Sequence, residues 1–286
     1  MSQDCFSYIP SVGEYFTEYI SVLIALLVVF TIALLGVTFL YVQVVKAIRK
    51  NYRQYNWLSL ILCNGIYMII LIFSIVSLVV PVLSDRMDLL SFVALSWCIY
   101  AFFWYIRLNC GGDEELRNMY EMKSGELLTG GKIKRKLFRY FGKYSAIKFY
   151  IVQFPFVATI VSITEIAFYF VNEDRYYRIV FFFLPVSIVS IVLKFIAFLL
   201  LIRYIKSSYP DSLLEKKFRL IRLVVLVVKI QVSILQAIFR QLHFDCDSYP
   251  GQAWSIYNFV KQPLIVAEIS VLAYFTWKVY RSESKK

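Results

Sequence analysis

The 286-residue sequence contains few charged residues and a single histidine. Asp, Glu, Lys and Arg make up 17% of the chain, whereas a soluble domain carries about a quarter. Catalytic zinc sites usually take three protein ligands, with histidine prominent among them. One histidine, His243 beside Asp245 in a loop, therefore argues against a membrane zinc hydrolase. We expect no metal site, no cofactor and no enzyme activity.

Glycine and proline are also scarce, with ten and seven residues, which excludes a fibrous or disordered chain. The first 20 residues contain no Lys or Arg, so they lack the basic start of a cleavable signal peptide. We expect an uncleaved first helix whose N-terminus is exported. No N-x-[ST] sequence occurs, and N-glycosylation is not expected.

Apolar residues, by contrast, make up 60% of the chain and gather in long blocks. A helix needs about 20 mostly apolar residues to cross a bilayer. Seven blocks meet this length, at 21–45, 57–82, 89–108, 148–171, 178–202, 220–240 and 257–280. The sequence therefore predicts an all-α, multi-pass membrane protein, a single domain of seven transmembrane helices spanning 1–286.

The net charge of +12 is distributed unevenly between the two sides of this predicted bundle. Of the 31 Lys and Arg, 24 fall at 46–53, 107–148, 203–222 and 278–286, which are alternate connections. Positive charge marks the cytoplasmic side, so the N-terminus is predicted outside and the C-terminus in the cytoplasm. The basic residues then face anionic lipid headgroups, and no nucleic-acid partner is expected.

The longest connection, residues 109–147, is predicted to be cytoplasmic. It opens with Cys110-Gly111-Gly112 followed by three acidic residues, and it ends in the basic run Lys132–Lys136. We interpret it as a solvated loop whose basic end lies on the inner leaflet, with a dedicated binding element as the alternative.

The five cysteines separate by compartment. Cys5 and Cys246 fall in the predicted exterior, where a disulfide is permitted, and we name them as a candidate pair. Cys63 and Cys98 fall inside helices, and Cys110 falls at the cytoplasmic end of the third helix.

Four ionisable residues are predicted to lie within the hydrocarbon: Glu165, Lys194, Lys229 and Glu268. Such residues are costly and usually face a bundle interior or a wet path. Lys229 and Glu268 fall near mid-depth on consecutive helices, and we expect them to pair or to share a cavity. Lys194 is expected to reach the inner surface on its long stem.

Polar neighbours at helical spacing accompany these charges. Ser233 and Gln236 share a stripe with Lys229. One interpretation is a polar path for an organic anion, with Lys229, Glu268, Ser233, Gln236, Glu165 and Lys194 as its candidates. The alternative is a set of interhelical contacts without a substrate.

The pattern Lys217-Phe218-x3-Arg222-x8-Gln231 resembles a motif of the organic solute transporter alpha-subunit family. The Gly-Gly-acidic segment after the third helix, and Gln153-Phe154-Pro155 in the fourth, are similar to segments of the same family. The order of these motifs agrees along nearly the whole chain. The family positions carried over are Gly111, Gly112, Gln153, Lys217, Arg222 and Gln231.

This resemblance implies a plasma-membrane transporter subunit that moves bile-acid-like anions, steroid conjugates or lipids by facilitated diffusion. It implies a single-span beta-type partner, with membrane lipids around the bundle and homo- or hetero-oligomers as further assemblies. An endomembrane location is the alternative. The long loop lacks the cysteine cluster of animal alpha subunits, which indicates a divergent member.

Two other functions fit the same topology. One is a seven-helix chemoreceptor-like receptor, although the third helix ends in Trp104-Tyr105-Ile106-Arg107, without an acidic residue before the arginine. The other is a protein that organises membrane trafficking or lipids, which the 22 Tyr and 25 Phe would suit.

Overall fold

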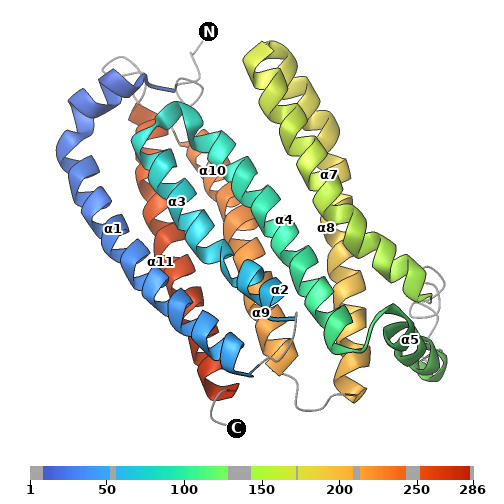
Figure 1. The fold of residues 1–286 in the computed structure, drawn as a ribbon. Coiled ribbons are helices and arrows are strands. Elements are labelled where there is room, and N and C mark those ends of the chain that lie inside the picture. Colours follow the sequence, from blue (N-terminus) through green and yellow to red (C-terminus); the bar gives the residue numbers. More distant parts are fainter. Residues whose placement is uncertain are drawn as a thin grey trace. The chain divides into compact units, whose positions relative to one another are not determined.

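The computed structural model describes residues 9–51, 56–127, 143–171, 173–208, 213–242 and 252–283 (Figure 1). Some side chains inside the helices, including those of Lys229 and Ser233, lie outside this description. The described residues are helical and contain no strand, which confirms the all-α prediction.

The described helices follow one another along the chain. The first are α1 (Val12–Asn51), α2 (Asn56–Asn64), α3 (Ile66–Val79), the 3₁₀ helix η1 (Pro81–Leu83), α4 (Ser84–Asn109) and α5 (Asp113–Leu127). The later ones are α7 (Tyr144–Val171), α8 (Glu173–Ser208), α9 (Leu213–Val225), the π-helix η2 (Leu226–Gln231), α10 (Val232–Gln241) and α11 (Gln252–Glu283).

Six segments of the described chain are long and apolar enough to cross a membrane. They are Val12–Asn51, Trp57–Val79, Pro81–Asn109, Tyr144–Phe168, Pro185–Ile205 and Gln252–Ser282. These six make the chain a multi-pass membrane protein. The remaining predicted span, 220–240, is covered by α9, η2 and α10 but is not among the six. The seventh span and the orientation of the termini stay predictions.

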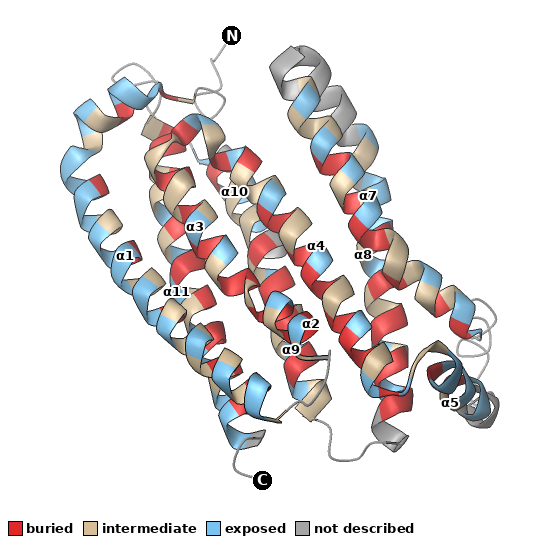
Figure 2. Cartoon of the chain, viewed as in Figure 1, coloured by how far each residue is buried: buried red, intermediate tan, exposed pale blue. Residues whose placement is uncertain are grey.

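The chain divides into two compact units. The first contains 1–51, 64–95 and 219–286, and the second contains 52–63 and 96–218. In the first unit α1, α3 and α11 pack together. The buried residues of α1 include Leu23, Phe30, Val37 and Val44, which recur every seven residues and so form one stripe. The rest of α1 is largely exposed and apolar, as expected for contact with lipid (Figure 2).

In the second unit α7 packs along α8, and α5 contacts both. Aromatic rings fill part of its core, where Phe218 stacks on Phe198 and Phe102 with centroid distances of 5.1 and 6.2 Å. Rings of this size bury a large apolar area and hold a defined geometry.

The start of the 109–147 connection folds into α5, a helix that the sequence analysis did not predict. Two backbone hydrogen bonds close the end of α4. They run from Gly112 N to Arg107 O (3.0 Å) and from Gly111 N to Leu108 O (3.4 Å). Gly111 has a φ of 86°, so the turn is a Schellman motif that ends the helix. Asp113 and the two residues after it then supply the acidic first turn that a helix N-terminus favours. The basic run Lys132–Lys136 lies outside the described residues.

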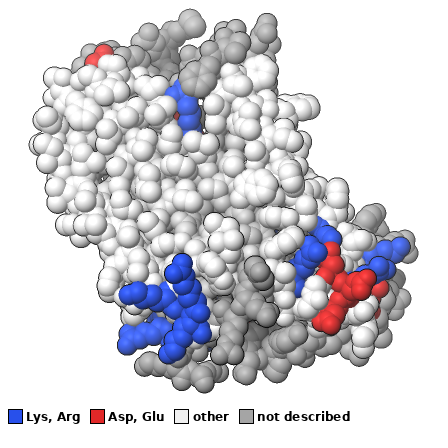
Figure 3. All heavy atoms as spheres, viewed as in Figure 1, with Lys and Arg blue, Asp and Glu red and all other residues white. Residues whose placement is uncertain are grey.

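Charge is confined to the ends of the helices on the face seen in Figure 3. Lys and Arg gather where α1 and α11 end, in last turns that contain Arg49, Lys50 and Arg281. Acidic and basic residues also meet around α5. Within each unit, the described surface that Figure 3 shows between the helix ends is almost uncharged, as a membrane-embedded surface requires.

Candidate functional site

Lys194 is the most deeply buried of the predicted intramembrane charges whose side chains are described. It lies near the middle of the span Pro185–Ile205, and its side chain is 0% exposed. Its Nζ has no hydrogen-bond partner in the described structure. The expectation that Lys194 reaches the inner surface is therefore wrong, because its stem runs into the second unit instead of along the helix surface.

Two aromatic rings surround the Lys194 ammonium. The Nζ lies 3.7 Å from the ring centroid of Phe154, on α7, and 4.1 Å from that of Phe195. Cation–π contacts of this kind offset part of the desolvation cost. One turn earlier on α8, the hydroxyl of Ser190 is also buried and lacks a hydrogen-bond partner in the described structure. The Lys194 ammonium thus lies between two aromatic rings, and a second buried polar group without a described partner, the Ser190 hydroxyl, lies on the same helix.

The predicted Lys229–Glu268 pair lies partly outside the described residues, because the Lys229 side chain is one of those left out. The same holds for Ser233. Glu268, on α11, is half-buried, and its Oε2 has no hydrogen-bond partner among the described residues. Gln236 is half-buried on α10. The pair stays a prediction.

The backbone around Lys229 differs from the predicted continuous α-helix. Residues Leu226–Gln231 form the π-helix η2 between α9 and α10. A π-helix shifts the phase of all later residues, so the stripe expected through Lys229, Ser233 and Gln236 does not keep regular α-helical spacing. Gln231 closes this segment, and its Nε2 has no described hydrogen-bond partner. Isolated π segments occur frequently at functional sites.

The Lys217-Phe218 motif anchors the start of α9 in the second unit. Lys217 is 4% exposed, and its Nζ lies 5.8 Å from the Tyr105 ring centroid. Phe218 joins the aromatic stack described above, whereas Arg222 is half-buried. These motif residues therefore pack and position the helix.

The motif residues of α7 differ in their contacts and burial. Phe154 contacts Lys194, and Gln153 and Glu165 are half-buried. Thr159 accepts a hydrogen bond from Trp97 Nε1 at 3.1 Å and donates one to the Pro155 carbonyl at 2.7 Å. The structure thus brings Phe154 and Lys194 together, a proximity that sequence spacing could not reveal.

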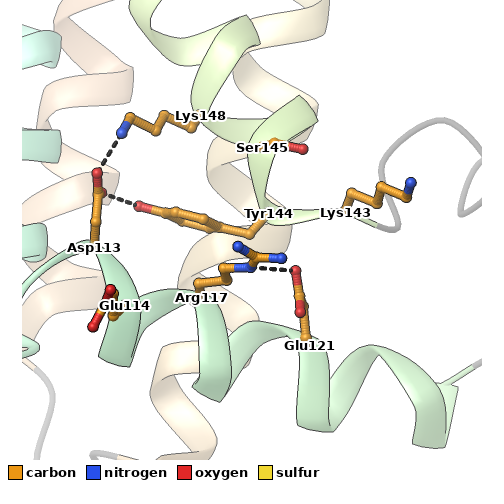
Figure 4. A pocket seen from close by; sticks show the side chains of 8 residues that line it. All are labelled: Asp113, Glu114, Arg117, Glu121, Lys143, Tyr144, Ser145 and Lys148. Carbon is orange, nitrogen blue, oxygen red and sulfur yellow. Dashed lines mark hydrogen bonds and ion pairs between the residues drawn. The ribbon is translucent and has the colours of Figure 1, made fainter.

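The turn at Gly111-Gly112 places Asp113 beside a cluster of basic residues. Asp113 accepts hydrogen bonds from Tyr144 (2.9 Å) and Lys148 (Figure 4). Arg107 Nε lies 3.2 Å from its Oδ1. Burial by itself would raise the pKa of Asp113, but the bonds from Lys148 and Tyr144 and the charge of Arg107 outweigh it. They hold that pKa below its ordinary value.

A cavity of about 640 Å³ opens between α5 and the start of α7. In Figure 4, Lys148 and Tyr144 point towards Asp113, and Arg117 points towards Glu121. Asp113 pairs with Lys148 on α7 and with Arg107 on α4, so the cluster joins α4, α5 and α7 in the second unit.

The first unit contains a buried polar network that the sequence analysis missed. Lys261, which falls near the start of the predicted block 257–280, has a fully buried side chain. Its Nζ donates to Ser84 Oγ and Asp88 Oδ2, both at 2.9 Å. Asn258, one turn earlier, donates to Ser77 O at 3.0 Å and to Tyr15 OH at 3.3 Å. The only sequence signal was the run of polar residues at the start of α11.

Two predicted features fall outside the described residues. The candidate disulfide partners Cys5 and Cys246 lie in 1–8 and 243–251, and His243 lies in the second of these ranges. Among the residues that were described, no group of three or more His, Cys, Asp and Glu could hold a metal ion.

Comparison with known proteins gives one match. The family model described as organic solute transporter Ostalpha matches residues 20–285, which is nearly the whole chain. No curated protein and no solved structure shows a significant match.

Proposed function

Because this chain belongs to the organic solute transporter Ostalpha family, we propose that it moves amphipathic organic anions across the membrane as a transporter subunit. The solutes are of the size and chemistry of steroid conjugates and bile-acid-like anions. Their movement is facilitated diffusion, and a single-span beta-type subunit completes the transporter at the plasma membrane.

The observation that carries this proposal is the Lys194 site. An unpaired ammonium within a membrane span costs about 2.5–3.5 kcal/mol or more, and packing alone gives no reason to keep it. An anionic group that enters beside Nζ would remove this cost. The rings of Phe154 and Phe195 would then contact the apolar part of the same solute, and Ser190 Oγ would donate to the anion.

Lys229 and Glu268, with Ser233 and Gln236, are proposed as further polar positions along which a solute passes. Support comes from the half-buried Glu268 carboxylate and from the π-helix that carries Lys229. Glu165 on α7 is the last of these candidates.

The test is uptake of labelled taurocholate and estrone sulfate by cells that express the full chain with and without candidate single-span partners. We expect uptake that depends on a partner and falls at least about tenfold in Lys194→Met. The matched control is Lys216→Met, which removes the same charge from an exposed position on α9. All variants are compared at equal surface expression.

Lys229→Met and Glu268→Gln are measured alongside and should also reduce uptake. Normal uptake in Lys194→Met would remove this lysine from the substrate path. No uptake with any partner, despite good surface expression, would refute transport and favour the receptor or trafficking function.

A further inference from the structure

Two cysteines on different helices lie in contact inside the second unit. Cys63, near the end of α2, and Cys98, in α4, have their Sγ atoms 3.1 Å apart, and Cys98 Sγ also donates to the Cys63 carbonyl at 3.1 Å. Both are free thiols, and they are 3% and 5% exposed. We propose that Cys63 and Cys98 form a reversible, oxidation-sensitive dithiol whose disulfide ties α2 to α4.

The geometry needs little rearrangement. A disulfide requires sulfur atoms that approach to about 2 Å, with side chains that already point at each other. The contact between the two Sγ atoms meets the second condition, and a shift of about 1 Å meets the first. The two cysteines are 35 residues apart, so the bond would close a long loop and restrain α2.

The oxidant is hydrogen peroxide, which is small and uncharged and can reach a buried thiol. The Cys98 thiolate attacks one peroxide oxygen, an S–O bond forms, the O–O bond breaks, and hydroxide leaves to become water with the Cys98 proton. The Cys63 sulfur then attacks the sulfenic sulfur, an S–S bond forms and the S–O bond breaks. The released hydroxide takes the Cys63 proton, so two thiols lose two electrons and one peroxide becomes two waters.

Cys110 is a control within the same unit. It is 2% exposed in the turn after α4, and burial raises the pKa of its thiol to about 11. Its thiol contacts no other cysteine in the described part of the chain. We expect Cys110 to remain reduced under conditions that oxidise the pair.

The experiment treats the full chain in membranes with hydrogen peroxide, blocks the remaining thiols with N-ethylmaleimide, and maps peptides by mass spectrometry without reduction. We expect a Cys63–Cys98 cross-linked peptide that dithiothreitol abolishes, and no such peptide in Cys63→Ser, where Cys98 stops at the sulfenic acid.

Absence of the cross-linked peptide, with both thiols still available to N-ethylmaleimide after unfolding, would overturn the proposal. The readout does not depend on transport, so it succeeds or fails separately from the proposed function.

Discussion

The ammonium of Lys261 lies 2.9 Å from the carboxylate of Asp88, and this contact joins the start of α11 to the start of α4. The lysine is fully buried, whereas a quarter of the Asp88 side chain is exposed. A charge is tolerated here because the carboxylate and the Ser84 hydroxyl both bind it.

Removing the carboxylate from this pair should destabilise the protein strongly. Asp88→Asn leaves the buried Lys261 charge uncompensated, which typically costs about 3–5 kcal/mol. We expect a clear fall in melting temperature in detergent, largely recovered in Asp88→Asn with Lys261→Met. Lys278→Met, at an exposed position on the same helix, is the control and should change little. A double variant as unstable as Asp88→Asn would contradict this account of the pair.

Gly111 should tolerate no side chain. Its φ of 86° is a conformation that costs other residues about 1–2 kcal/mol, and an added Cβ would collide with the Glu115 carboxylate. Gly111→Ala should therefore lower the melting temperature and expose α5 to proteases. Gly36→Ala is the control, because no atom lies within 4 Å of its added Cβ. Adding Glu115→Ala to Gly111→Ala removes the collision but not the backbone strain, so only partial recovery is expected.

The Asp113 cluster should weaken in acid. The pKa of Asp113 is lower in the folded protein than its ordinary value of 3.8, so the stabilisation is complete above that value. It is lost as the pH falls through the lower, folded value, because the protonated carboxyl no longer holds Lys148 and Arg107. The melting-temperature difference between the wild type and Asp113→Asn should thus be constant down to about pH 4 and shrink below it. A difference that stays constant to about pH 2 would argue against the carboxylate as its source.

The stability of Lys194→Met distinguishes a lysine that holds the helices together from one that binds a ligand. If the role of the Lys194 ammonium is to bind a ligand, an apolar side chain at this position removes the free-energy cost of burying the charge. Lys194→Met should then be at least as stable as the wild type. The melting temperature should therefore hold or rise while uptake falls. A large loss of stability in Lys194→Met, with none in Lys216→Met, would instead indicate that Lys194 holds helices together.

Much of the fold was predictable because hydropathy is a property of the local sequence. The blocks 21–45, 148–171 and 257–280 each lie within or close to a helix that the structure contains, α1, α7 and α11. The family resemblance was confirmed for the same reason, since its motifs are short and ordered along the chain.

The candidate site was only partly predictable. Lys194 was recognised as an intramembrane charge, but its direction was wrong, because sequence gives the depth of a residue and not the neighbours of its side chain. The burial of Lys261 was not predicted, although the residue falls inside the predicted block 257–280. Its partner Asp88 comes from a helix far away in sequence, which no local pattern indicates.

Long apolar blocks and the order of short motifs are enough to identify this chain as a multi-pass membrane protein of a transporter family, because both are local features of the sequence. Which charges are paired depends on contacts between helices. Lys194 lies between two aromatic rings with no hydrogen-bond partner among the described residues, whereas Lys261 has a carboxylate, although both lysines occur in apolar helices. The physical reason is that the energy of a buried charge depends on atoms a few ångströms away in space, and these come from other helices.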